Sequence, residues 1–249
     1  MDSSSVQAYE SAARVAAYDA DMDLMHPNRH KMVEVIAEVL AVTADPRLVV
    51  DLGTGTGFLL DGLLRRFPNC RAVAIDGSRQ MVAAAKSRLG ELAERVEFVI
   101  GDLRQAETLA LVTVSADAVV SSYALHHLNL EEKAELLGRC RTRLKQGGWF
   151  LNADLVAEED EFLEGLTQEM RVAGIVERAQ GRDPRFPDAA ATRRFLDDLQ
   201  RNECDQPQEL ADDLRIARER GYEHVALLWR DTREVVWGGL GRKNAAREI

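Results

Sequence analysis

The chain has 249 residues and 46% of them are hydrophobic, so it can bury a sizeable core and global disorder is not expected. With 32 basic and 42 acidic side chains its net charge is −10, which argues against broad binding to nucleic acid or to an anionic membrane. Its three cysteines are far apart and form no CxxC or Cys/His cluster, and no apolar run reaches the ~20 residues that span a bilayer.

The first predicted elements are two helices, over residues ~5–20 and ~28–42. In the second helix the apolar residues recur at helical spacing. The sequence Ala-Asp-Pro-Arg at residues 44–47 then breaks the pattern. We therefore assign residues 1–45 to an N-terminal helical cap.

Residues 46–155 alternate between strands and helices. Short apolar runs predict strands at residues 48–53, 71–76, 96–102, 116–122 and 149–154. Helices are expected at residues 58–66, 78–93 and 130–144, with a turn at 145–148 before the last strand. This rhythm predicts a parallel, doubly wound α/β sheet, and near-continuous apolar strands are typical of a sheet covered on both faces.

Residues 156–220 interrupt this rhythm. They are charged, helix-prone and broken by a proline-rich stretch at 183–187, so we expect a helical insertion or lid. Strand signals return at residues 224–230 and 234–240. A short turn separates these two runs, which predicts that residues 221–249 form an antiparallel hairpin completing the sheet at its edge.

A glycine-rich loop, DLGTGTG at residues 51–57, lies where the first strand meets the following helix. Ligands bind at this position in open α/β sheets, and the glycines would allow close approach to the backbone; an ordinary strand–helix turn is the alternative. Phe58 stands where the dinucleotide fingerprint G-x-G-x-x-G requires its third glycine. The acid that begins the loop, Asp51, suits an amino-bearing ligand better than a phosphate.

Two further acids follow predicted strands. Asp76 ends the second strand about 20 residues after the loop, where a carboxylate can accept both hydroxyls of an adenosine ribose. Its alternative role is that of a turn residue or helix N-cap. Asp102, after the third strand, is placed to accept a hydrogen bond from an adenine amino group, with a turn aspartate as the alternative.

Together these residues resemble class I S-adenosylmethionine-dependent methyltransferases. The resemblance covers about residues 45–155 through VVDLGTGTG, AVAIDGS, GDL, ADAVVSSYALHHL and RLKQGGWFLNAD, where Gln146 replaces the usual proline. It implies a Rossmann-like, mostly parallel seven-stranded sheet with an antiparallel edge strand, and S-adenosylmethionine as cofactor. It also implies that Asp51 and the loop glycines hold the methionine part and that the backbone near Ser121 helps to bind its amino group. The motifs and the resemblance give these cofactor-binding residues: Tyr18, Asp51, Gly53, Thr54, Gly55, Gly57, Asp76, Gly77, Asp102, Leu103 and Ser121.

Methyl transfer is an in-line displacement at a sulfonium carbon, so alignment provides much of the acceleration. A base is needed only if the acceptor must lose a proton. His126 and His127 follow the fourth strand and are the candidate bases, unless they pack under the lid or cap the next helix. The ring of Tyr18 would favour the sulfonium cation, with plain core packing as the alternative.

We expect a cytoplasmic methyltransferase without a metal, acting on a small-molecule acceptor rather than on nucleic acid or at a membrane. Trp229 and Trp237 indicate edge-strand packing or a homodimer contact.

The end of the chain also resembles carboxy-S-adenosylmethionine synthases, in which an arginine of the inserted region binds a carboxylate. Arg193 and Arg194 lie in a loosely comparable place. A nicotinamide-dependent oxidoreductase is a competing hypothesis, although the G-x-x-G spacing and Tyr-x-x-x-Lys pair of that class are absent here. A non-catalytic cofactor-binding subunit is another.

Overall fold

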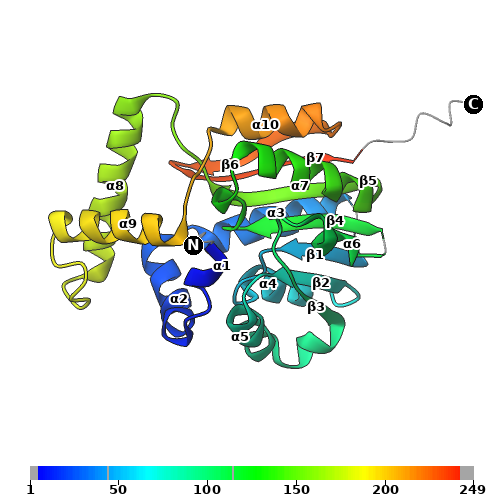
Figure 1. The fold of residues 1–249 in the computed structure, drawn as a ribbon, viewed down its shortest axis with the longest axis horizontal. Coiled ribbons are helices and arrows are strands. Elements are labelled where there is room, and N and C mark those ends of the chain that lie inside the picture. Colours follow the sequence, from blue (N-terminus) through cyan, green and yellow to red (C-terminus); the bar gives the residue numbers. More distant parts are fainter. Residues whose placement is uncertain (1–4, 44, 114, 242–249) are drawn as a thin grey trace, which may run out of the picture.

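The computed structural model describes residues 5–43, 45–113 and 115–241. In this part of the chain, seven strands form one sheet in the order β3-β2-β1-β4-β5-β7-β6 (Figure 1). Helices cover both faces of the sheet. The expected Rossmann-like, doubly wound α/β fold is therefore confirmed.

All strands of this sheet run in one direction except β7. The strands are β1 (Leu48–Leu52), β2 (Arg71–Asp76), β3 (Val96–Ile100), β4 (Ala116–Ser122), β5 (Leu144–Leu155), β6 (Glu223–Asp231) and β7 (Glu234–Leu240). The terminal hairpin is confirmed, but its antiparallel strand β7 lies between β5 and β6, so the edge strand is β6. The expected turn at residues 145–148 is instead a bulge within β5, because Ala116 pairs with Leu144 while Ala118 pairs with Trp149.

The N-terminal segment has a break where one helix was expected. α1 (Ser5–Ala8) is followed by a turn, and α2 (Ala12–Met25) begins after Ser11, whose hydroxyl accepts from the backbone N–H of Arg14. A serine at this position satisfies a free N–H of the helix start and so favours a new beginning. α3 (Arg29–Thr43) then packs an apolar face against the sheet.

In the described residues, four α-helices lie between β1 and β5: α4 (Phe58–Arg66), α5 (Arg79–Leu89), α6 (Ala106–Ala110) and α7 (Leu130–Arg143). α5 ends earlier than expected because Gly90 adopts a positive φ of 52°. Side chains alternate between two apolar clusters, so that Val49 faces α3 and α4 while Val50 faces α7. This double coverage explains why the strands read as continuous apolar runs.

Two helices of the predicted insertion, α8 (Glu161–Ala179) and α9 (Ala189–Glu203), project away from the sheet at the left of Figure 1. They share an apolar cluster with Met25 of α2. The third, α10 (Leu210–Glu219), lies within the range expected for the lid but packs on the sheet, because Ile216 and Ala217 are buried with α7 and β7. In the described ranges no helix is long and apolar enough to cross a membrane.

Candidate functional site

The glycine-rich loop turns sharply at the carboxyl end of β1. The backbone N–H of Gly53 donates to the carbonyl of Ile75 over 2.8 Å, which draws the loop toward β2. Gly53 has φ +68°, and a Cβ there would lie 2.3 Å from the Cβ of Ala124, so a larger residue does not fit. Gly57, at the start of α4, packs behind the loop against Ala85 rather than facing a cavity.

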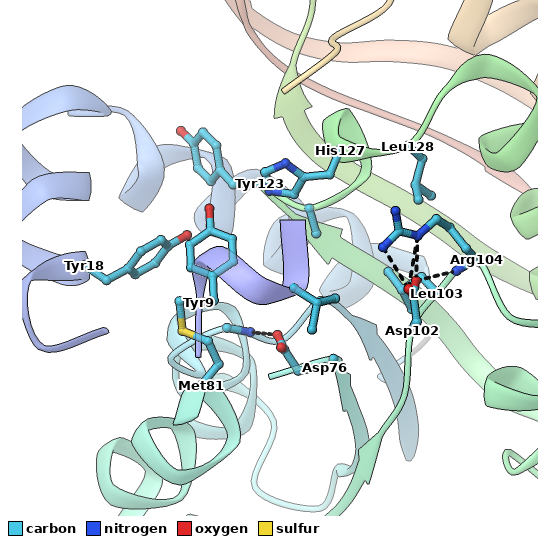
Figure 2. Close-up of a pocket in the computed structure, with 15 residues that line it drawn as sticks. Tyr9, Tyr18, Asp76, Met81, Asp102, Leu103, Arg104, Tyr123, His127 and Leu128 are labelled. Carbon is cyan, nitrogen blue, oxygen red and sulfur yellow. Dashed lines mark hydrogen bonds and ion pairs between the residues drawn. The ribbon is translucent and has the colours of Figure 1, made fainter. Parts of the chain in front are cut away.

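A cavity with about 630 Å³ of empty space opens beside this loop, and we call it the main cavity (Figure 2). Its size is within the range of small-ligand sites. It lies at the carboxyl ends of the strands, where open α/β sheets bind ligands. It brings together these predicted site residues: Tyr18, Gly53, Gly55, Asp76, Gly77, Asp102, Leu103 and His127.

A second, smaller cavity adjoins the main cavity at Tyr18, Gly53, Gly55 and Tyr123, and we call it the side cavity. The predicted residues Asp51 and Thr54 line it. So does Arg29, which the sequence did not single out.

The carboxylate of Asp51 is buried and only half satisfied. Thr54 Oγ1 donates to Asp51 Oδ2 over 2.6 Å, whereas Oδ1 has no hydrogen-bond partner among the described residues. Burial raises the pKa of Asp51 to about 7. A buried carboxylate oxygen without a partner is suited to accept a hydrogen bond from a cationic group of a ligand.

The guanidinium of Arg29 supplies the opposite charge in the side cavity. It is only 3% exposed, lies 3.6 Å from the ring centroid of Phe58, and pairs with Asp19 at 2.8 Å. A small ligand with one ammonium and one carboxylate would therefore meet Asp51 and Arg29 in the same cavity.

Asp76 holds two neighbouring turns together. Its Oδ2 accepts from the backbone N–H of Gly55 and its Oδ1 from that of Ser78, both over 2.8 Å. Burial raises the pKa of Asp76, and these two N–H groups oppose that rise. Each oxygen retains a lone pair for a further donor, so a ligand diol can still bind to both.

Asp102 lies across the main cavity from the tyrosines (Figure 2). Arg104 donates to both of its oxygens, at 2.8–3.1 Å. Burial alone would raise the pKa of Asp102, but Arg104 lowers it, so the group stays ionised. Asp102 is thus a charged hydrogen-bond acceptor at the cavity wall, and Arg104 already occupies part of its accepting capacity.

The N-terminal segment lies over the turn that follows β2. Ser78 Oγ donates to the carbonyl of Tyr9 over 2.7 Å, and the backbone N–H of Arg79 donates to Glu10 over 2.9 Å. A Cβ on Gly77 would lie 2.6 Å from Val6, so glycine is required for this contact. The rings of Tyr9 and Tyr18 meet edge to face at 5.8 Å on the cavity wall.

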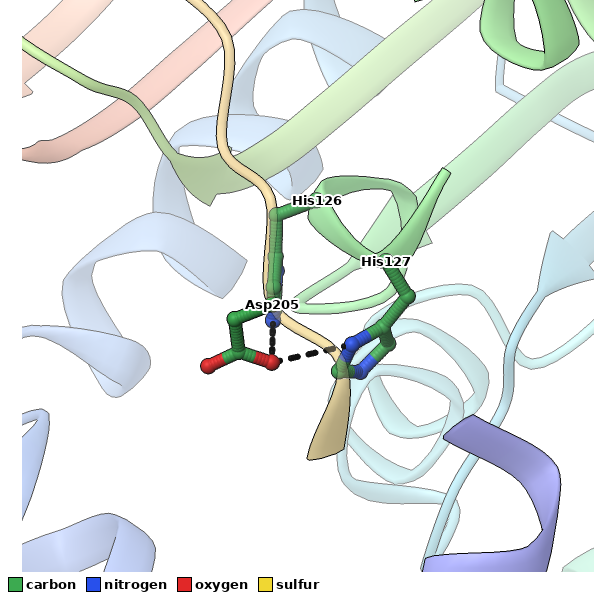
Figure 3. Close-up of side chains that lie close together, drawn as sticks. All are labelled: His126, His127 and Asp205. Atoms are coloured by element: carbon green, nitrogen blue, oxygen red, sulfur yellow. Dashed lines mark ion pairs between the residues drawn. The ribbon is translucent and has the colours of Figure 1, made fainter. Parts of the chain in front are cut away.

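His126 is held between two carboxylates, those of Asp154 and Asp205, and Figure 3 shows the second of them. Its Nδ1 lies 2.6 Å from Asp154 and its Nε2 lies 3.5 Å from Asp205. Burial alone would lower the pKa of His126, but Asp154 and Asp205 raise it to about 10. A ring that holds its proton at neutral pH is a poor base, so this environment favours His127 over His126 for that expected role.

His127 lines the main cavity, and its Nδ1 lies 3.0 Å from the same Asp205 oxygen (Figure 3). This places the ring between the cavity and the segment that follows α9. The ligand atoms of His126, His127 and Asp205 lie within 4.8 Å of one another, close enough to reach a common metal ion.

Other expected residues lie elsewhere. Ser121 Oγ donates to the carbonyl of Leu52 inside the sheet, and the cavities are lined by its neighbours Ser122 and Tyr123 instead. Trp237 is fully buried, so it packs in the core and offers no surface for a homodimer contact. Arg193 pairs with Asp197 on an exposed face of α9.

Comparison with known proteins finds the same core. Residues 49–148 match a sequence family described as a methyltransferase domain. The demethylmenaquinone methyltransferase of Thermotoga maritima is 31% identical over 128 residues, which cover 51% of this chain and 50% of that protein. The carboxy-S-adenosyl-L-methionine synthase of Stutzerimonas stutzeri is 28% identical over 159 residues, covering 62% of this chain and 64% of that protein.

Among solved structures, an O-methyltransferase family protein from Burkholderia thailandensis has a TM-score of 0.67 and 22% identity. The similarity covers 95% of this chain and 64% of that one, and at this identity it is a similarity of fold. The chain spans about half the length of the first curated relatives that it matches.

Proposed function

We propose that this chain transfers the methyl group of S-adenosylmethionine to a small molecule, because it carries a class I S-adenosylmethionine-dependent methyltransferase domain over residues 49–148. The methyl group would go to an oxygen, nitrogen or carbon of the acceptor by in-line displacement. The observation that carries the proposal is that Asp51, with its unpartnered oxygen, and the cationic Arg29 line the same side cavity.

The residues present fit this cofactor from end to end. Asp51 would accept from the ammonium of the methionine part and Arg29 would bind its carboxylate. Asp76 would accept from the ribose hydroxyls, as in other open α/β sheets, and Asp102 from the adenine amino group. The ring of Tyr18, which lines both cavities, would lie beside the sulfonium.

When bound, S-adenosylmethionine supplies a methyl group on a positively charged, already activated leaving group. The protein then has to align the acceptor, exclude water and receive a proton where the acceptor releases one. We propose His127 for the last role, since it lines the main cavity and Asp205 can orient its ring. His126, being protonated, would only position Asp205 and the adjoining loop.

The cover over the site supports a small acceptor. α1 and α2 line the main cavity through Val6 and Tyr18, with Tyr9 between them, and α2 packs with α8 and α9 in one apolar cluster. We propose that these helices form a movable cover that secludes the reaction. Together with the net charge of −10, this argues against a nucleic-acid acceptor.

Two competing enzyme classes have less support from these residues. An oxidoreductase would bind pyrophosphate, yet Phe58 packs against Arg29 where a third glycine is needed. A carboxy-S-adenosylmethionine synthase would need an arginine of the inserted region at the cofactor, but neither Arg193 nor Arg194 is among the residues that line the main or the side cavity.

Calorimetric titration tests the proposal. We expect S-adenosylmethionine and S-adenosylhomocysteine to bind and nicotinamide dinucleotides not to bind. Tight binding of a nicotinamide dinucleotide, with none of S-adenosylmethionine, would refute it. Incubation of the protein with isotopically labelled methyl donor and a metabolite extract then separates an enzyme from a non-catalytic subunit, because only an enzyme produces labelled products.

A further inference from the structure

Arg171 of α8 lies at the junction of two further cavities. The outer one is lined by α2, α8 and the turn between β6 and β7. The inner one is lined by Arg171, His126 and Asp205, and it shares Tyr9, Tyr18 and Tyr123 with the main cavity. The three tyrosines therefore form the wall between the inner cavity and the space proposed for the cofactor.

The guanidinium of Arg171 feels the charges of Asp205 and Glu234, but it has no direct partner among the described residues. In the ranges that the structure describes, it makes no ion pair and no hydrogen bond. Burial, together with the neighbouring Arg233, lowers the pKa of Arg171 to about 10, yet the group remains cationic at neutral pH. The side chain is half-buried and lines both cavities, so an anion that enters either cavity can accept hydrogen bonds from its N–H groups.

The nearby carboxylate on β7 is already engaged by other donors. Glu234 accepts from Tyr123 over 2.6 Å and from Asn28 over 2.8 Å, and His26 Nδ1 lies 3.0 Å away. Glu234 therefore has three hydrogen-bonding partners of its own, and it attracts Arg171 without a hydrogen bond or an ion pair.

The acids of the inner cavity are likewise engaged. Asp205 faces His126 and His127, and Glu203 accepts two hydrogen bonds from Arg14, at 2.7 and 2.9 Å. Among the described residues that line the inner cavity, Arg171 is thus a charged side chain without a hydrogen bond or an ion pair.

We propose that Arg171 binds a carboxylate of the methyl acceptor, and hence that the acceptor is a small organic acid. This inference rests on the proposed methyl transfer. A guanidinium offers two parallel N–H donors that match the two oxygens of a carboxylate. Because Arg171 lines the inner and outer cavities but not the main cavity, it anchors the carboxylate away from the cofactor and leaves the reacting atom at the tyrosine wall.

Methyl transfer to such an acid needs no reactant beyond the cofactor, the acceptor and a group that receives a proton. A lone pair of the acceptor atom forms the new bond to the methyl carbon while the carbon–sulfur bond breaks and its electron pair stays on sulfur. The products are the methylated acid and S-adenosylhomocysteine. If the reacting atom was protonated, its proton passes to His127 or to water, and the carboxylate on Arg171 is unchanged.

The test uses the S-adenosylhomocysteine-loaded protein and two probes, benzoate and its neutral counterpart benzamide. We expect benzoate to bind at least about tenfold more tightly than benzamide. Arg171→Gln should remove this preference while leaving the affinity for S-adenosylhomocysteine within about threefold of the parent protein. Arg178→Gln is the matched control, because Arg178 is on the same helix and lines the outer cavity only.

Equal binding of the two probes, or benzoate affinity that survives Arg171→Gln, overturns the inference. A second arm divides a metabolite extract by charge before labelled methyl donor is added, and we expect label in products of the anionic fraction. Label only in products of the neutral or cationic fractions overturns the inference as well. Label in no fraction contradicts the proposed methyl transfer instead, and the benzoate arm then decides the role of Arg171.

Discussion

Replacement of Asp51 by asparagine should stabilise the ligand-free protein at pH 8 and weaken cofactor binding. Asp51 is 1% exposed, and burial raises its pKa from 3.8 to about 7. The folded state therefore holds a proton between about pH 4 and pH 7 that the unfolded state releases. Stability falls as the pH rises through this window, and above pH 7 the buried charge has its full effect.

The size of both effects follows from this shift. At about 1.4 kcal/mol per pKa unit, the buried charge of Asp51 destabilises the protein by up to about 4 kcal/mol above pH 7. Asparagine cannot ionise and can still accept from Thr54, so Asp51→Asn should recover about 2 kcal/mol at pH 8. Loss of the charged partner should weaken S-adenosylhomocysteine binding by at least about 2 kcal/mol, about thirtyfold.

Urea denaturation at pH 5 and pH 8 measures the first effect and calorimetry the second. The stabilisation should be present at pH 8 and largely absent at pH 5. For the parent protein, affinity should fall roughly tenfold from pH 8 to pH 6, because Asp51 must release a proton before it binds an ammonium. Asp117→Asn is the control, since Lys145 and backbone N–H groups lower the pKa of Asp117 against the effect of burial. A destabilised Asp51→Asn protein at pH 8, or an unchanged affinity, would refute the reasoning.

Three further outcomes are expected. Asp76→Ala should weaken S-adenosylhomocysteine binding by about 1.5–3 kcal/mol in calorimetry with an unchanged circular dichroism spectrum; an unchanged affinity would leave Asp76 as a turn residue. His127→Gln should lower kcat with labelled methyl donor at least about tenfold without changing cofactor affinity, and equal kcat would exclude His127 as the base. In hydrogen exchange, α1, α2, α8 and α9 should exchange faster than β1 and slow when S-adenosylhomocysteine binds, whereas helices as protected as β1 would contradict a movable cover.

Local sequence patterns were sufficient to predict the sheet and the site residues at the carboxyl ends of β1, β2 and β3. The loop at residues 51–57 and the acids Asp76 and Asp102 follow strand ends, and parallel strands end at the same edge of a sheet. The apolar strands and the short turn between β6 and β7 could likewise be predicted without information on long-range contacts.

The features that sequence reasoning missed depend on contacts between distant segments. α10 carries the same charged, amphipathic pattern as α8 and α9, and only its packing with α7 shows that it covers the sheet. The protonation of His126 is determined by Asp154 and Asp205, which lie on β5 and after α9. No sequence motif marked Arg29 as a site residue, because its role depends on the cavity that it shares with Asp51.

The segment after α9 links the cover to the cofactor site. Gln206 donates through its backbone to His126 and through its side chain to His127, both over 2.9 Å, and Gln208 donates to Leu128 over 3.1 Å. His127 and Leu128 also line the main cavity. Outward movement of this segment must therefore break these hydrogen bonds and separate Asp205 from a protonated histidine, or else carry part of the cavity wall with it. Either way, the position of α9 and the shape of the cofactor site change together, which is the physical basis for expecting ligand binding to alter exchange in the cover.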